Sequence, residues 1–207
     1  MSRISKIKLL MKSDKELLLG LSRIGVSTPD MAYEYCKVNH DRLVSLEKSR
    51  YITIEKVPIN GQSNEILHLT KFGQNFMHKT FGINYFPTWQ TTHLFHDLRL
   101  AREYFELPHD IRQNWTHENT ILRAHKDIVC GSCVDAIVTM PYKEFLELAK
   151  INDRFQILNS SAANSLSLDD EISVAVEAIG SSYTTDMITE KYATAVTQLG
   201  CIAVITC

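Results

Sequence analysis

The chain has 207 residues, of which 44% are hydrophobic and 22% are charged, as in an ordinary water-soluble globular protein. No apolar run approaches the ~20 residues that cross a bilayer, and lysines interrupt the apolar residues at the start, so we expect neither a membrane span nor a signal peptide. Five cysteines, an odd number, exclude the disulfide framework of a small secreted protein, and we expect a cytoplasmic protein.

The formal net charge of −2 conceals an asymmetry along the chain. Residues 1–81 carry 13 Lys and Arg against 8 Asp and Glu, a balance of +5, whereas residues 82–207 carry 9 against 16, a balance of −7. This division predicts two modules with different partners. The basic first module is the candidate for binding a polyanion.

The sequence predicts three helices near its start, at residues 14–24, 29–35 and 40–49. The first and third have apolar side chains at helical spacing, and the second begins at a Ser-Thr-Pro-Asp segment that supplies an N-cap and a proline. Asn39 is the predicted N-cap of the third helix. The inward face of that helix is expected to consist of Leu43, Val44 and Leu46.

A β-hairpin and a fourth helix are predicted next. Alternating polar and apolar side chains indicate strands at residues 51–57 and 65–69, joined by a turn at Asn60-Gly61. Thr70 is the predicted cap of the fourth helix. Glycine and proline within residues 81–87 break the periodicity and indicate a module boundary there.

The rest of the chain alternates helices and strands, which is typical of an α/β arrangement. A long amphipathic helix at residues 91–106 is expected to form most of a linking segment, residues 83–112. The elements predicted after it are strands at residues 114–117, 134–140, 172–177 and 201–206, helices at residues 118–125, 142–151 and 184–199, and a loop at residues 160–170.

Three helices followed by a hairpin form the winged-helix arrangement, so we expect an N-terminal winged helix over residues 1–82. In such a domain the third helix lies in the major groove of DNA, where Asn and Arg read base edges, and a hairpin lysine neutralises phosphate. The predicted DNA-binding residues are Asn39, His40, Arg42, Ser45 and Lys48 on the outward side of the third helix, Arg50 after it and Lys56 on the hairpin. The alternative is that these charges form a solvated face of a dimerisation or docking module.

Four short motifs carry a resemblance to a known family. They are His93–Leu100, Trp115–Glu118, Val134–Ala136 and Val174–Glu177. In this order and spacing they resemble the replication-relaxation family, plasmid and mobile-element proteins that join a winged helix to a domain related to the PD-(D/E)XK nuclease fold. The resemblance covers nearly the whole chain. It implies an α+β protein whose residues 113–207 form a small nuclease-like α/β domain, with a role in plasmid DNA relaxation, mobilisation or replication control.

The resemblance also implies a set of catalytic positions. In the nuclease fold, acidic side chains hold a divalent cation that activates water beside the scissile phosphate, and a lysine stabilises the developing charge. The matching acidic residues here are Glu118, Asp135 and Glu177. Ile179 stands where the family has its lysine and Val134 where it has a proline, which favours a non-catalytic domain. Lys191, on the following helix, can supply the positive charge if the catalytic lysine has moved to another position in this sequence. Mg²⁺ is expected as a cofactor only if the nuclease-like site is active.

A second metal site can be drawn around Cys130 and Cys133, whose spacing suits zinc and which follow His117 and His125. The spacing of these four residues matches no zinc-finger pattern. Buried structural thiols are the alternative interpretation, and no metal is required.

The sequence thus predicts a DNA-binding accessory protein of plasmid or mobile-element replication, relaxation or mobilisation that needs no catalysis. Two other hypotheses stay open: a metal-dependent endonuclease, and a transcriptional regulator whose second domain serves dimerisation or ligand binding. The expected partners are double-stranded DNA, a relaxase or replication protein, and a second copy of the chain, with no membrane.

Overall fold

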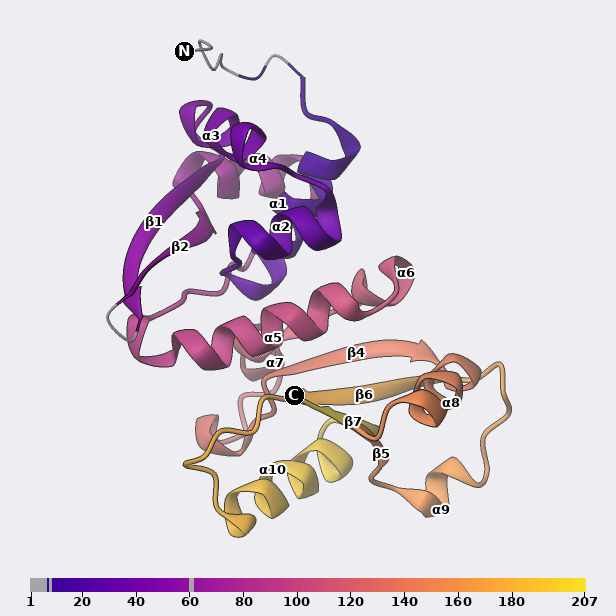
Figure 1. Ribbon diagram of the computed structural model, residues 1–207. Helices are drawn as coiled ribbons and strands as arrows, with labels where there is room; N and C mark the ends of the chain where they lie inside the picture. Colours follow the sequence, from indigo (N-terminus) through magenta and orange to yellow (C-terminus); the bar gives the residue numbers. More distant parts are fainter. Residues whose placement is uncertain (1–6, 8, 60–61) are drawn as a thin grey trace. The chain divides into compact units, whose positions relative to one another are not determined.

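A computed structural model describes residue 7, residues 9–59 and residues 62–207, and it has the α+β class, with two separate sheets (Figure 1). The chain divides into two compact units, the first ending at Glu106 and the second running from Leu107 to Cys207. Among the residues that are described, no helix has the length and apolar character needed to cross a membrane.

The division between the units falls later than the sequence suggests. The predicted linking helix is observed as a 3₁₀ turn, Thr91–His93, followed by α5, Leu94–Glu106. Helix α5 packs against α1, Lys12–Ile24, and α2, Pro29–Cys36. The first unit therefore includes this helix, and its core extends beyond residue 82.

The three predicted helices of the first unit are confirmed, the third being α3, His40–Lys48. Asn39 caps α3 as predicted, since its side chain accepts a hydrogen bond of 2.9 Å from the backbone N–H of Arg42. Leu43 and Leu46 are buried as expected, whereas Val44 is only half-buried because it lies at the edge of the inward stripe.

The predicted hairpin consists of β1, Ile52–Ile59, and β2, Gln62–Leu69, which pair antiparallel over their whole length. The predicted turn at Asn60-Gly61 lies outside the described residues. Helix α4, Lys71–Phe81, follows, and Thr70 caps it by accepting a hydrogen bond from the backbone N–H of Gly73. A Cβ atom at Gly73 would lie 2.1 Å from the carbonyl oxygen of Tyr51, so the start of α4 can approach the backbone just before β1 only with glycine there.

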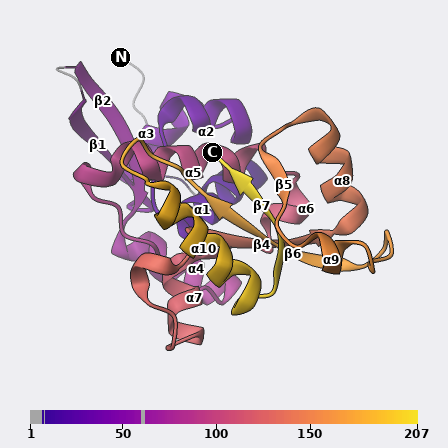
Figure 2. The same cartoon turned by 90° about the horizontal axis from the view of Figure 1, so that it is seen from below.

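The second unit is built on a five-stranded sheet in the order β3-β4-β6-β7-β5. Figure 2 labels four of these strands, β4, β5, β6 and β7. Strands β6 and β7 are parallel, and the other neighbours are antiparallel. Because parallel neighbours need a crossover, α10 connects β6 to β7 and packs against β7. The bounds of the strands are Thr116–His117 for β3, Ala136–Pro141 for β4, Phe155–Ile157 for β5, Glu171–Glu177 for β6 and Cys201–Thr206 for β7. The helices are α6 at His109–Arg112, α7 at Glu118–Ala124, α8 at Tyr142–Ile151, α9 at Ser160–Ala163 and α10 at Thr185–Thr197, with a 3₁₀ turn at Cys130–Ser132.

Three short elements of this unit differ from the sequence prediction, and one of them is α6, which lies in the predicted linking segment after residue 106. Strand β5 was not predicted, because it has three residues of which only Phe155 is buried, too few to establish an alternating pattern. The predicted loop at residues 160–170 begins with α9, a single helical turn that Asn159 caps by accepting from the N–H of Ala162. Strand β5 and helix α9 lie between β4 and β6 in the chain.

Candidate functional site

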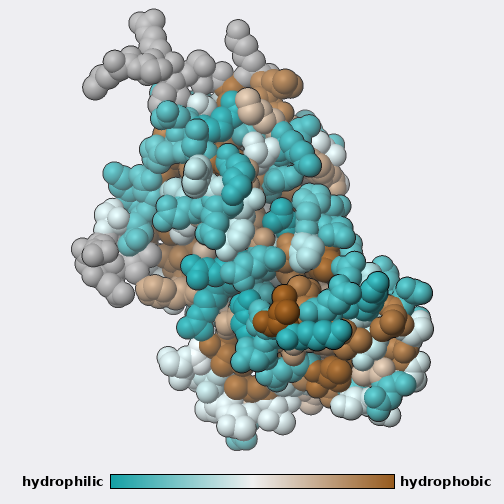
Figure 3. Space-filling view, turned by 45° about the vertical axis from the view of Figure 1, so that its right-hand side comes forward, coloured by the Kyte–Doolittle hydropathy of each residue, from teal (hydrophilic) through white to brown (hydrophobic). Residues whose placement is uncertain are grey.

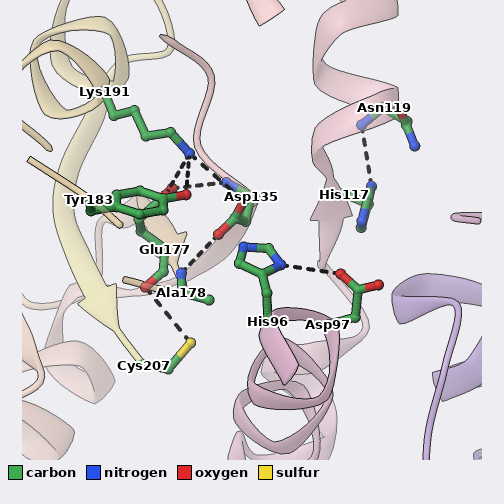
Figure 4. Close-up of polar contacts among 10 residues, drawn as sticks. All are labelled: His96, Asp97, His117, Asn119, Asp135, Glu177, Ala178, Tyr183, Lys191 and Cys207. Atoms are coloured by element: carbon green, nitrogen blue, oxygen red, sulfur yellow. Dashed lines mark hydrogen bonds and ion pairs between the residues drawn. The ribbon is translucent and has the colours of Figure 1, made fainter. Parts of the chain in front are cut away.

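The sheet of the second unit brings two acidic residues together. Asp135 immediately precedes β4, Glu177 ends the neighbouring antiparallel strand β6, and Ala136 pairs with Val176 in that ladder. The backbone N–H of Asp135 donates to Oε2 of Glu177 at 3.2 Å, and the N–H of Ala178 donates to Oδ2 of Asp135 at 2.8 Å. Backbone N–H groups at the start of β4 and just after the end of β6 thus hold the carboxylates of Glu177 and Asp135 in place (Figure 4).

Helix α10 places a lysine against these acids. The Nζ atom of Lys191 lies 2.5 Å from Oε1 of Glu177 and 3.9 Å from Oδ1 of Asp135 (Figure 4). It also donates to the hydroxyl of Tyr183 at 3.2 Å and lies 5.1 Å from the centre of that ring. Glu177 is fully buried, and Asp135 and Lys191 are each 6% exposed, so the charges are held almost entirely out of water. We call Asp135, Glu177, Tyr183 and Lys191 the Lys191 cluster.

Burial and charge pull the pKa values of the cluster in opposite directions. Burial alone lowers the pKa of Lys191, but Asp135 and Glu177 outweigh it and the pKa is raised above its ordinary value. Burial and then Asp135 raise the pKa of Glu177, while Lys191 opposes the shift. Burial and then Glu177 raise the pKa of Tyr183 to about 12. Lys191 is therefore a cation at neutral pH and Tyr183 a neutral phenol that accepts its hydrogen bond.

The structure joins three of the four predicted catalytic residues, namely Asp135, Glu177 and Lys191. Glu118 begins α7, and its backbone N–H donates to the carbonyl oxygen of Asp135 at 2.8 Å. Within the described part of the chain, no group of three His, Cys, Asp or Glu side chains is placed to hold a metal ion. Tyr183 was not predicted, since it lies in the connection before α10 and belongs to no motif.

A resident divalent cation does not fit the Lys191 cluster. Both oxygens of Glu177 are engaged, one by Lys191 and one by the N–H of Asp135. Oδ2 of Asp135 accepts from Ala178, which leaves two largely satisfied carboxylates in place of the six or more oxygen ligands that Mg²⁺ or Ca²⁺ requires. The position between the acids already contains the positive charge of Lys191.

The predicted cysteine site is described only in part. Cys133 is fully buried, and burial followed by the charge of Glu118 raises its thiol pKa to about 12, so it is protonated at neutral pH. His117 caps α7 through its Nδ1 atom, which accepts from the N–H of Asn119. The side chain of Cys130 lies outside the described part of the structure. These contacts favour the interpretation of Cys133 as a structural thiol.

The side chain of Arg42, one of the predicted DNA-binding residues, is hydrogen-bonded to other residues of the first unit. Its Nη2 and Nε atoms bind the two carboxylate oxygens of Asp14 at 2.5 and 2.9 Å, and Nη2 also donates to the carbonyl of Leu9 at 3.0 Å. Asp14 is fully buried, and its hydrogen bond is the main cause of the raised pKa of Arg42. This placement argues against Arg42 as a base-reading residue, because the N–H groups of its guanidinium already donate to Asp14 on α1.

Three further predicted residues line or approach one groove. Asn39, His40 and Lys56 are all exposed and line an open groove of about 710 Å³ on the first unit. His40 lies 3.4 Å from the carboxylate of Glu65 across this groove, and the exposed ring of Tyr33 forms part of its wall. Ser45 instead donates its hydroxyl to the carbonyl of Asp41.

Lys48 and Arg50 lie at the end of α3 and are exposed. Arg50 has a φ of 68°, in the left-handed region, and its guanidinium lies 6.0 Å from the ring centre of Phe72. Hydrophilic side chains cover much of one face of this unit (Figure 3).

Compared with family models, with curated proteins and with solved structures, the chain has no match in any of the three. The resemblance to the replication-relaxation family therefore stays a prediction, and the function has to be argued from the geometry of the two units.

Proposed function

We propose that this chain is a DNA-binding protein, in which a winged helix in the first unit binds double-stranded DNA of a plasmid or mobile element. The observation that carries the proposal is the groove in which Asn39, His40 and Lys56 meet, between the start of α3 and the hairpin β1–β2. In winged helices, the third helix and the hairpin are the two elements that contact DNA. The order α1, α2, α3, β1, β2 supports the same assignment.

The charge of the first unit supports a polyanionic ligand. Lys48, Arg50 and Lys56 are exposed and belong to the third helix, its end and the hairpin. Cations at these positions neutralise phosphates and release counterions, which gives a salt-dependent affinity for DNA of any sequence. Sequence preference is then assigned to Asn39 and His40, since Arg42 is paired with Asp14.

The test is a fluorescence-anisotropy titration of the intact chain with duplex DNA from its own genetic element, at several salt concentrations. Lys56→Ala is expected to weaken binding to all sequences and to lower the slope of log K against log salt by about 1. Lys143→Ala on α8, an exposed lysine of the second unit, is the matched control and is expected to change neither. Binding that is independent of salt, or equally weakened by both substitutions, would refute the proposal.

We assign a nuclease-like fold to the second unit, with a binding or structural role and no catalysis. The adjacent antiparallel strands β4 and β6, which carry Asp135 and Glu177, and the crossover by α10 to the parallel strand β7 support this assignment. A relaxase or replication protein and a second copy of the chain are the protein partners that the proposal implies.

One observation favours a second candidate function, metal-dependent cleavage of DNA. Lys191 contacts Glu177 and approaches Asp135, where the lysine of a nuclease site would be needed. The test is a nicking assay on supercoiled plasmid with MgCl₂ or MnCl₂, run on the intact chain and on Asp135→Ala, Lys191→Ala and Lys143→Ala. We expect no nicking above background, because the acids are already engaged. Nicking that Asp135→Ala and Lys191→Ala both abolish, and Lys143→Ala leaves unchanged, would establish the endonuclease instead.

A further inference from the structure

The groove of the first unit contains a carboxylate beside its basic residues. Glu65, on β2, lines the groove together with His40 and Lys56. We propose that Glu65 determines sequence specificity there, by accepting a hydrogen bond from the exocyclic amino group of a cytosine or an adenine in the major groove and by keeping phosphates away from this position. The inference rests on the proposed function and extends it to a residue outside the predicted DNA-binding set.

The register of the hairpin places Glu65 next to Lys56. The two residues are direct partners in the antiparallel ladder of β1 and β2, so their side chains lie on the same face of the hairpin. Oε2 of Glu65 also lies 3.4 Å from Nε2 of His40, at the start of α3. The side chain of Glu65 is 32% exposed, so it is accessible to a ligand in the groove. One accessible carboxylate therefore has a basic neighbour on each of the two elements that contact DNA in a winged helix.

The charge of Glu65 decides which part of DNA can lie against it. A phosphate at this position would meet a negative charge, and two such charges about 4 Å apart in water repel strongly enough to weaken binding about fivefold. Asp30, on α2, is a second carboxylate that lines the same groove. The edge of a base carries no net charge and avoids this repulsion. The groove at Glu65 therefore suits a base edge better than the phosphate backbone.

The base edges of the major groove differ in what they offer to a carboxylate. Cytosine presents its N4 amino group and adenine its N6 amino group, whereas guanine and thymine present oxygen acceptors that a carboxylate repels. The partner base of either pair presents such an oxygen next to the amino group, which suits the ring N–H of His40 beside Glu65. Glu65 and His40 together thus match one base pair, with the cytosine or adenine on the side of Glu65.

The test is a selection of bound duplexes from a pool with a randomised segment, followed by sequencing, for the intact chain and for Glu65→Ala. The wild type is expected to select cytosine or adenine at one position where Glu65→Ala loses about tenfold of the preference, as for the loss of one base contact. Preferences at the other positions should stay unchanged. Anisotropy titrations with a non-specific duplex in low salt should show about fivefold tighter binding by Glu65→Ala, because a negative charge is removed.

Two matched variants separate a base contact from a general effect of charge. Glu55→Ala removes an exposed glutamate of the same hairpin, which lies 3.2 Å from His68 and, being next to Lys56 along β1, points to the opposite face. It is expected to select the same sequence as the wild type. Asp30→Ala removes a carboxylate of the groove itself and is expected to tighten non-specific binding without changing the selected sequence. A thermal melt of each variant checks that it is folded.

Two results would overturn the inference and leave the proposed function intact. One is a Glu65→Ala chain that selects the same sequence as the wild type, since the carboxylate would then act by its charge alone. The other is an equal loss of preference in Glu55→Ala, because the effect would then not belong to the groove. A wild type that shows no salt-dependent binding to any duplex would overturn the proposed function and this inference together.

Discussion

Arg42 illustrates how a single residue can have a different role from the one its pattern indicates. Its position in the helical period places it outside the buried stripe of α3, which is where a DNA-reading arginine is expected. The sequence does not reveal that Asp14, on α1, is fully buried and needs a partner. A buried carboxylate without a counter-charge is costly, and the guanidinium of Arg42 meets it with two hydrogen bonds.

We expect Arg42→Ala to destabilise the first unit by about 3–5 kcal/mol, because it removes the counter-charge of the buried Asp14 carboxylate and leaves it the hydrogen bond from the backbone N–H of Met11. Urea unfolding of the intact chain, followed by circular dichroism, measures the change. Asp14→Asn combined with Arg42→Ala should recover part of the loss, since the buried group is then neutral. A weakened DNA affinity with unchanged stability would return Arg42 to the role of a base-reading residue.

At the same scale, the candidate site was predictable only in part. Asp135 and Glu177 were predicted only as what the resemblance to the replication-relaxation family implies, and Lys191 as a substitute for the lysine that the family pattern has and this chain lacks. Their engagement with one another could not be predicted, because the register of β4 against β6 and the rotation of α10 decide which atoms meet. Tyr183 has no sequence signal, since a tyrosine in a short connection is ordinary until its hydroxyl is placed beside an ammonium group.

At the scale of elements, the strongest sequence signals were the capping residues at the starts of helices. Asn39 and Thr70 were predicted as N-caps and both accept the expected backbone hydrogen bonds. Long periodic segments such as α8 and α10 were predicted with their limits nearly correct. Strand β5 and helices α6 and α9 were missed, because three or four residues give too short a pattern to be recognised.

The same reasoning explains why the limits of the two units could not be predicted from composition. Gly82 has a positive φ and ends α4, so glycine there does mark a real break in the chain. A helix end is a local event, whereas a unit ends where its contacts end. Buried residues of α5, among them Leu100 and Ala101, belong to a helix that packs on α1 and α2, and these long-range contacts extend the first unit to Glu106.

At the scale of the whole molecule, the two units have opposite charges. With the limit at Glu106, the first unit carries 15 Lys and Arg against 11 Asp and Glu, and the second carries 7 against 13, so their balances are +4 and −6. A polyanion is attracted by the first unit and repelled by the second. The second unit should therefore weaken non-specific binding to DNA and leave the preference for a specific sequence with the first.

We accordingly expect a fragment of residues 1–106 to bind non-specific duplex DNA more tightly than the intact chain in low salt, because it lacks the acidic unit. The difference should decrease as salt is added, since the Debye length falls from ~30 Å at 0.01 M to ~3 Å at 1 M and long-range repulsion is screened. Anisotropy titrations of both proteins between low and high salt measure it, after a cooperative melt has shown that the fragment folds. A folded fragment that binds more weakly than the intact chain at every salt concentration would show that the second unit itself contributes to the DNA-binding surface.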